Sequence, residues 1–111
     1  MKKNKIIICL ILLIFSQNVL ANLMKGNYEN IEGNDESICS QRVIPIFKKN
    51  NLIKLKVYYT GWCNNQGPYL FNCIEKNYCT DGLNSINIEN KKEYVWKNPA
   101  VFIWGRFKFV N

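Results

Sequence analysis

The sequence predicts an all-β protein, a small antiparallel β-barrel or sandwich of about seven short strands stapled by two disulfides. Three observations predict this class. Short segments of alternating apolar and polar residues are separated by polar turns. Four cysteines remain once an N-terminal export signal is removed. After residue 21, no segment keeps a helical period for more than about two turns, which favours all-β over α+β.

Residues 1–21 have the organisation of a secretory signal peptide. Three lysines within the first five residues precede ten apolar residues, Ile6 to Phe15, and residues 19–21 (Val-Leu-Ala) end the segment with Ala at the last position. As a helix, ten residues would span about 15 Å, half of a ~30 Å hydrocarbon core, so an uncleaved anchor is the less favoured alternative. We expect cleavage after Ala21, export to the periplasm or the medium, and one domain of residues 22–111 without a stable membrane span.

Charge and composition exclude several functions. The 90 residues after the signal hold 12 basic and 8 acidic side chains, a net charge of +4, which is too modest for a nucleic-acid footprint. The chain has no His, which excludes Ser-His-Asp and Cys-His nucleophiles and His-ligated metals. A composition of 48% hydrophobic and 21% charged residues is typical of a globular protein.

Four cysteines, Cys39, Cys63, Cys73 and Cys79, predict two structural disulfides in an exported chain. Small domains are marginally stable without such staples, each of which contributes about 2–4 kcal/mol. Gaps of 23, 9 and 5 residues leave no Cys-x-x-Cys motif, which argues against a zinc site or a thioredoxin-like redox site. We expect neither a metal nor a cofactor, and three disulfide pairings remain open.

The clearest predicted element is a β-hairpin within residues 42–59. A polar turn at residues 48–51 separates two alternating segments, and a four-residue hairpin loop is a common connection. Pairing Phe47 with Leu52 collects the apolar side chains on one face of the hairpin: Ile44, Ile46, Ile53, Leu55 and Val57.

This register places Ile44 opposite Leu55, whereas a shift of one residue would place Ile44 opposite Lys56 and scatter the apolar set. We therefore expect the first register. Pro45 has no N–H to donate to a ladder, so the first strand of the hairpin is expected at an edge.

Further strands are expected at residues 26–31, 68–74, 85–89, 94–96 and 101–110, with turns at 64–67, 80–82 and 90–92 and a break at Asn98-Pro99. Gly105, inside the last of these, suggests a bulge or a close backbone approach. The acidic segment of residues 29–40 lacks the spacing of a calcium loop and is expected to be a solvated loop leading into Cys39.

The most unusual segment, residues 60–69, contains Trp62 and Tyr69 beside a cysteine and follows Tyr58 and Tyr59. Aromatic side chains on a rigid loop supply large contact area at low entropic cost, which is typical of binding surfaces. The alternative, that Trp62 caps the barrel and packs into the core, is favoured because Trp usually serves packing.

A second candidate surface lies on the C-terminal strand, where Trp104, Arg106 and Lys108 share one face. Trp104 and Arg106 suit recognition of a carbohydrate, a peptide or an anionic group by stacking and bidentate hydrogen bonds. The preferred alternative is a solvated basic face opposite a core face, which carries Ile103, Phe107 and Phe109.

No pattern places two acidic residues on one strand face, so we expect no catalytic site. The favoured function is an exported binding or interaction module, for example an enzyme inhibitor or an envelope- or host-facing binder, whose partner is a protein or glycan outside the cytoplasm. The alternatives are a small secreted hydrolase using carboxylates and a barrel that binds single-stranded nucleic acid. Export and modest charge argue against a nucleic-acid partner.

Overall fold

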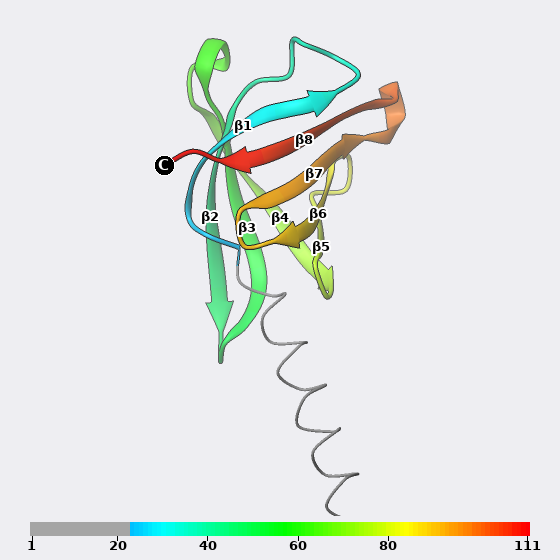
Figure 1. The fold of residues 1–111 in the computed structure, drawn as a ribbon. Helices are drawn as coiled ribbons and strands as arrows, with labels where there is room; N and C mark the ends of the chain where they lie inside the picture. Colours follow the sequence, from blue (N-terminus) through cyan, green and yellow to red (C-terminus); the bar gives the residue numbers. More distant parts are fainter. Residues whose placement is uncertain (1–22) are drawn as a thin grey trace, which may run out of the picture.

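The computed structural model describes residues 23–111, which form a closed barrel of eight antiparallel strands in sequence order (Figure 1). The predicted all-β fold with two disulfides is confirmed, and the pairs are Cys39–Cys63 and Cys73–Cys79. The predicted signal peptide and its cleavage after Ala21 lie outside the described residues. Within residues 23–111, no helix is long and apolar enough to cross a membrane.

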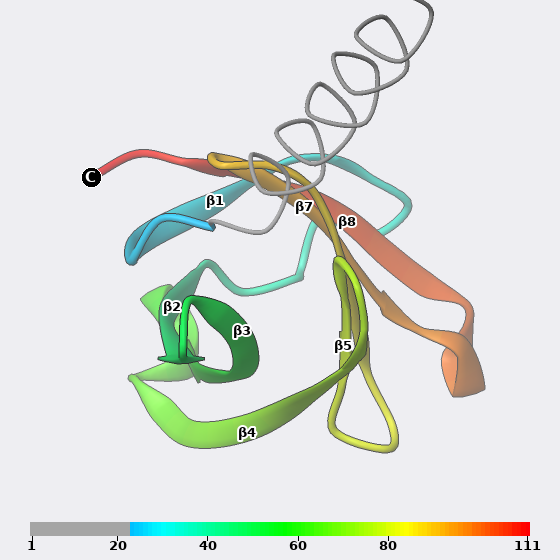
Figure 2. The ribbon, with the colours of Figure 1, turned by 90° about the horizontal axis from the view of Figure 1, so that it is seen from below.

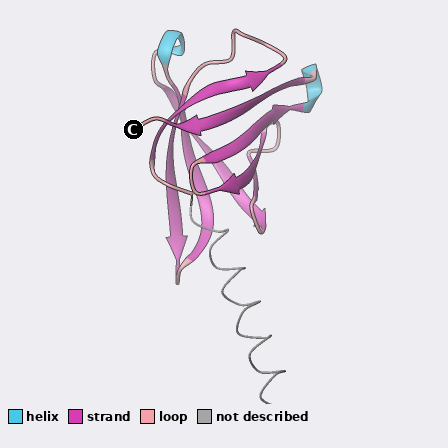
Figure 3. Ribbon diagram, viewed as in Figure 1, coloured by secondary structure: helices cyan, strands magenta, loops and turns pink. Residues whose placement is uncertain are grey.

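The strands alternate with short connections, two of which contain a 3₁₀ turn (Figure 3). In chain order the elements are β1 (Gly26–Gly33), β2 (Gln41–Lys48), β3 (Asn51–Tyr59), η1 (Gly61–Cys63), β4 (Gln66–Glu75), β5 (Tyr78–Thr80), β6 (Ser85–Asn90), β7 (Glu93–Asn98), η2 (Pro99–Val101) and β8 (Ile103–Phe109). The alternation of the sequence does not predict β5, because a strand of three residues is too short to show an alternating pattern.

The β2–β3 hairpin has the predicted pairing at its turn but a different register beyond it. Phe47 faces Leu52 as expected, and the register then shifts so that Ile44 faces Lys56. The predicted pairing of Ile44 with Leu55 is therefore wrong. A bulge inserts one extra residue into one strand, and alternation along the sequence does not reveal it.

This bulge decides which residues of the hairpin face the barrel interior. Val43, Leu55 and Val57 are fully buried, whereas Ile44 and Ile46 are only half-buried. Pro45 lies beyond the three residue pairs that join β1 to β2, so its missing N–H removes no bond to β1. The first strand of the hairpin is therefore not an edge strand, because it belongs to a closed barrel. Only its segment around Pro45 has no pairing partner on the β1 side.

The strands surround a central interior (Figure 2), and each of the eight contributes at least one buried side chain to the core. The rings of Tyr94 and Phe107 stack with centroids 5.3 Å apart, and Tyr28 lies 4.9 Å from Tyr94. Gln41 is a fully buried polar residue, and its Oε1 accepts a hydrogen bond of 2.6 Å from the Tyr94 hydroxyl.

Gly105 on β8 allows the close approach that the sequence suggested. A Cβ at this position would lie 2.9 Å from Asn30 Oδ1 and 3.2 Å from Ile38 Cδ1. The pairing of β1 with β8 also shifts between Asn30 and Glu32, directly across from this region. The absent side chain therefore leaves room for residues from β1 and from the connection that follows it.

Because the strands follow one another around the barrel, their connections alternate between its two ends (Figure 1). We call one end the loop end; it consists of residues 34–40, 60–65, 81–84 and 99–102. The opposite, turn end consists of residues 49–50, 76–77 and 91–92. The longer connections all belong to the loop end, where the candidate site lies.

Candidate functional site

Two connections of the loop end are fixed against each other. The disulfide Cys39–Cys63 joins residues 34–40 to residues 60–65. Beside it, the backbone N–H of Thr60 donates to the Ser40 carbonyl at 2.8 Å. A covalent bond and a neighbouring hydrogen bond thus hold the segment around η1 in place.

Trp62, in η1, is 71% exposed, so the favoured prediction that it packs into the core is wrong. Its indole N–H donates to the Ser37 carbonyl at 3.1 Å, which ties the ring to the neighbouring connection. The interior at this end is already occupied by Tyr59 and Trp96, whose ring centroids lie 6.4 Å apart. Because strand residues fill this space, the Trp62 ring lies on the surface.

A second exposed aromatic side chain, Phe102, is not among the predicted site residues. It is 84% exposed and has a left-handed backbone with φ of 56°, which is unusual for a bulky residue. Residues 101–102 were assigned to the last strand, but β8 begins at Ile103. The Asn98-Pro99 pair is the signal in the sequence for the turn that carries Phe102. The Asn98 side chain caps η2 by accepting a hydrogen bond from the Ala100 N–H.

Asn34 ties Phe102 to the same acidic connection that holds Trp62. Its side-chain amide donates to the Phe102 carbonyl at 2.6 Å, and its Oδ1 accepts from the Trp104 N–H at 2.9 Å. Residues 34–40 therefore make hydrogen bonds to the connections that carry both exposed aromatic rings.

The other predicted aromatic residues separate into two places. Tyr59 and Tyr69 have ring centroids 5.2 Å apart, and the Tyr59 hydroxyl accepts from Asn84 Nδ2 at 3.5 Å. Burial raises the pKa of Tyr59 to about 12, whereas Tyr69 is 42% exposed. Tyr58 lies apart from this pair, with the Arg42 guanidinium 5.3 Å from its ring centroid.

The candidate surface on β8 has the predicted alternation, with Phe107 fully buried and Trp104 and Arg106 half-buried. The Arg106 guanidinium is already paired: its Nε lies 3.4 Å from Glu32 Oε2, and its Nη1 contacts Glu89. An anion bound there would have to compete with two carboxylates.

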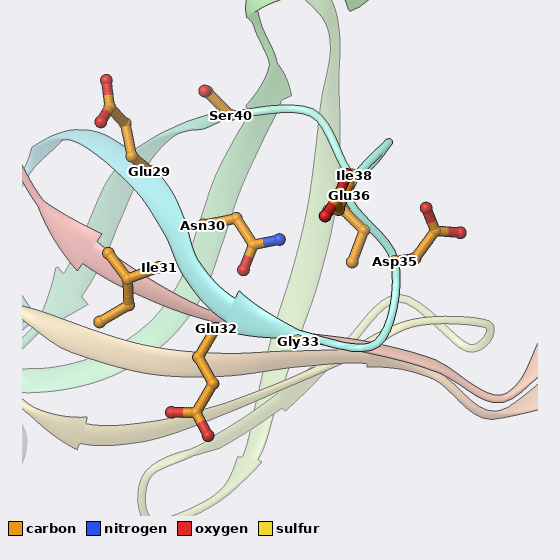
Figure 4. A pocket seen from close by; sticks show the side chains of 9 residues that line it. All are labelled: Glu29, Asn30, Ile31, Glu32, Gly33, Asp35, Glu36, Ile38 and Ser40. Carbon is orange, nitrogen blue, oxygen red and sulfur yellow. The ribbon is translucent and has the colours of Figure 1, made fainter.

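An open pocket of about 440 Å³ lies between β1 and residues 34–40 (Figure 4). It forms because β1 pairs with β2 only through Gly26–Tyr28, and the chain beyond arches away before returning to β2. Nine residues line it: Glu29, Asn30, Ile31, Glu32, Gly33, Asp35, Glu36, Ile38 and Ser40.

Four of these lining residues are acidic, and Asp35 is held in its ionised form. The Ser37 hydroxyl and backbone N–H both donate to Asp35 Oδ1, at 2.6 and 2.8 Å, and they lower the pKa of this carboxyl. An ionised carboxylate accepts hydrogen bonds and attracts cations, but near neutral pH it does not act as a general acid. In the part of the chain that the structure describes, no three His, Cys, Asp or Glu residues are placed to hold a metal ion.

The two ends of the barrel differ in charge. The loop end contains Asp35, Glu36 and Asp81 and no Lys or Arg in its four connections. The turn end contains no acidic residue and four lysines in its three connections: Lys49, Lys76, Lys91 and Lys92. The exposed aromatic rings and the acidic pocket therefore share one negatively charged end.

Comparisons of the chain with protein-family models, with curated proteins and with solved structures find no match. The features that point to a function lie at the loop end: two exposed aromatic rings, an acidic pocket and connections joined by a disulfide.

Proposed function

We propose that the protein is an exported binding module that contacts a protein partner outside the cytoplasm through its loop end. An inhibitor of an enzyme and an envelope- or host-facing binder both belong to this class. The observation that carries the proposal is the exposure of Trp62 (71%) and Phe102 (84%) on connections tied to residues 34–40. Large aromatic side chains supply most of the binding energy at many protein interfaces.

The connections around these rings support the proposal because they limit the entropy lost on binding. Trp62 is adjacent to a disulfide-bonded cysteine, and its indole is hydrogen-bonded to Ser37. Phe102 keeps a strained backbone, and its carbonyl is hydrogen-bonded to Asn34. A surface that is ordered before binding loses less conformational freedom when its partner docks. Two disulfides are also typical of proteins outside the reducing cytoplasm.

The test compares partner capture by the wild type and by two double variants. Trp62→Ala/Phe102→Ala removes the exposed rings of the loop end. The matched control, Phe47→Ala/Ile74→Ala, removes two exposed apolar side chains (43% and 65%) near the turn end. Each exported protein is immobilised and incubated with envelope and culture-fluid extracts. The affinity of any stoichiometric partner that is captured is then measured by biolayer interferometry.

We expect the loop-end variant to bind its partner more than about tenfold more weakly, while the control variant keeps wild-type affinity. Circular dichroism spectra and melting curves show whether each variant is folded. Equal affinity of the two folded variants, or no stoichiometric partner in either extract, would contradict the proposal.

A further inference from the structure

The chemistry of the loop end also specifies the kind of partner. Resting on the proposed binding function, we infer that the docking partner is a basic protein, whose contact surface places Lys or Arg side chains beside apolar ones. Trp62 and Phe102 meet the apolar side chains, and the carboxylates of the connection that is hydrogen-bonded to Phe102 and Trp62 meet the cations.

Charge is distributed unevenly over the barrel. The whole domain after the signal is basic, with 12 basic and 8 acidic residues, yet no basic residue lies in the four loop-end connections. Asp35, Glu36 and Asp81 give these connections a local negative potential, whereas four lysines lie in the connections of the turn end and Lys97, in β7, is the basic residue next to the loop end. Such a field orients a basic partner toward the loop end and repels acidic proteins, nucleic acids and anionic glycans.

The carboxylates that line the pocket differ in whether they already have a partner. Glu32 is already paired with Arg106, and Asp35 accepts hydrogen bonds from Ser37. Among residues 23–111, no Lys or Arg lies within ion-pair distance of Glu29 or Glu36. Figure 4 shows Glu29, Asp35 and Glu36 placed around the open pocket. Two carboxylates therefore remain available to an incoming cation.

An aromatic and an acidic group of the loop end are neighbours. The Trp62 indole N–H donates to the carbonyl of Ser37, the residue that follows Glu36 in the chain. A guanidinium group from a partner meets here both an exposed indole face and a carboxylate. Arg uses these two kinds of contact together, through cation–π stacking and charge-assisted hydrogen bonds.

The probe for this inference is a displayed library of random dodecapeptides, selected on the exported protein and counter-selected on the folded Trp62→Ala/Phe102→Ala variant. We expect the enriched sequences to carry a net positive charge, with Lys or Arg beside apolar residues. The enriched peptides are then synthesised, and their dissociation constants are measured by isothermal titration calorimetry.

The electrostatic part is tested with isosteric substitutions at opposite ends of the barrel. Glu29→Gln/Glu36→Gln neutralises the available carboxylates of the pocket, and Glu75→Gln/Glu93→Gln removes the same charge beside the turn end. We expect the pocket variant to bind the peptides about tenfold more weakly and the control to bind like the wild type. Raising the salt concentration from about 50 to about 500 mM should weaken wild-type binding in the same direction.

The outcomes separate this inference from the function on which it rests. Enrichment of loop-end-dependent peptides that are acidic or uncharged would overturn the inference of a basic partner. Peptides whose affinity is unchanged by Glu29→Gln/Glu36→Gln and by salt would do the same. Either result would leave the proposed binding function intact. Failure to enrich any loop-end-dependent peptide would overturn both. Docking of the turn-end lysines of a second copy would also overturn the inference, and it would be detected as concentration-dependent self-association in sedimentation experiments.

Discussion

Removing the disulfide between Cys39 and Cys63 tests how the loop end is held together. The perturbation is Cys39→Ala/Cys63→Ala, and the matched control is Cys73→Ala/Cys79→Ala. In each pair one cysteine is buried and the other is half-buried, so the loss of packing is similar in the two variants. The pairs differ in the chain length that they close, with sequence separations of 24 and 6 residues.

The expected magnitudes follow from the entropy that each loop closure removes from the unfolded chain. A closed loop of 24 residues corresponds to about 3.5 kcal/mol and one of 6 residues to about 2.2 kcal/mol at 25 °C. The free energy of unfolding should therefore fall about 1.3 kcal/mol further in the first variant. For a domain of this size, loss of the longer closure lowers the melting temperature by roughly 14–28 °C.

The assay is urea unfolding followed by far-ultraviolet circular dichroism, with linear extrapolation to water. Intact mass after thiol alkylation without reduction shows that the remaining disulfide is formed in each variant. An equal or larger loss in the Cys73→Ala/Cys79→Ala variant, or a loss below about 1 kcal/mol in the Cys39→Ala/Cys63→Ala variant, would refute the reasoning from loop closure.

Three further predictions concern the interior of the barrel. Tyr94→Phe removes the buried hydroxyl that donates to Gln41, and should lower the free energy of unfolding by about 1–3 kcal/mol in urea titrations; an unchanged midpoint would contradict it. Gly105→Ala forces a Cβ to within 2.9 Å of Asn30 Oδ1, and we expect a loss of about 1–3 kcal/mol in thermal unfolding, whereas wild-type stability would show that Asn30 moves freely. The pKa of Tyr59 is about 12 in the folded barrel, so the unfolded chain ionises first and stability should fall as pH rises from about 10 through 12. Unfolding titrations across this range should show a shallower fall for Tyr59→Phe, and identical pH dependence would contradict the assigned burial.

Features that depend on neighbouring residues in the chain were predictable from the sequence. Alternating polarity located seven of the eight strands to within a few residues, because the two faces of a strand meet different environments. The even number of cysteines after the predicted export signal predicted two disulfides, although it left the pairing open. The close approach at Gly105 was also readable, because a glycine inside a strand seldom serves packing.

Strand register and side-chain exposure were decided by contacts between segments that are distant in the chain. The bulge next to Phe47 changes the partner of Ile44 from the predicted Leu55 to Lys56. No local pattern in the sequence reveals such an inserted residue. Trp62 lies outside because Tyr59 and Trp96 already occupy the interior at that end, which the composition of its own loop does not show.

The sequence by itself thus determined the fold class, the approximate positions of most strands and the number of disulfides. Closure of the barrel decided which connections meet at one end, and with them the grouping of Trp62, Phe102 and the acidic residues 35–36. The same closure paired Arg106 with Glu32 and Glu89, which the predicted face of β8 did not anticipate. Side-chain pattern is local information along a strand, whereas a surface is assembled from segments that only the folded chain brings together.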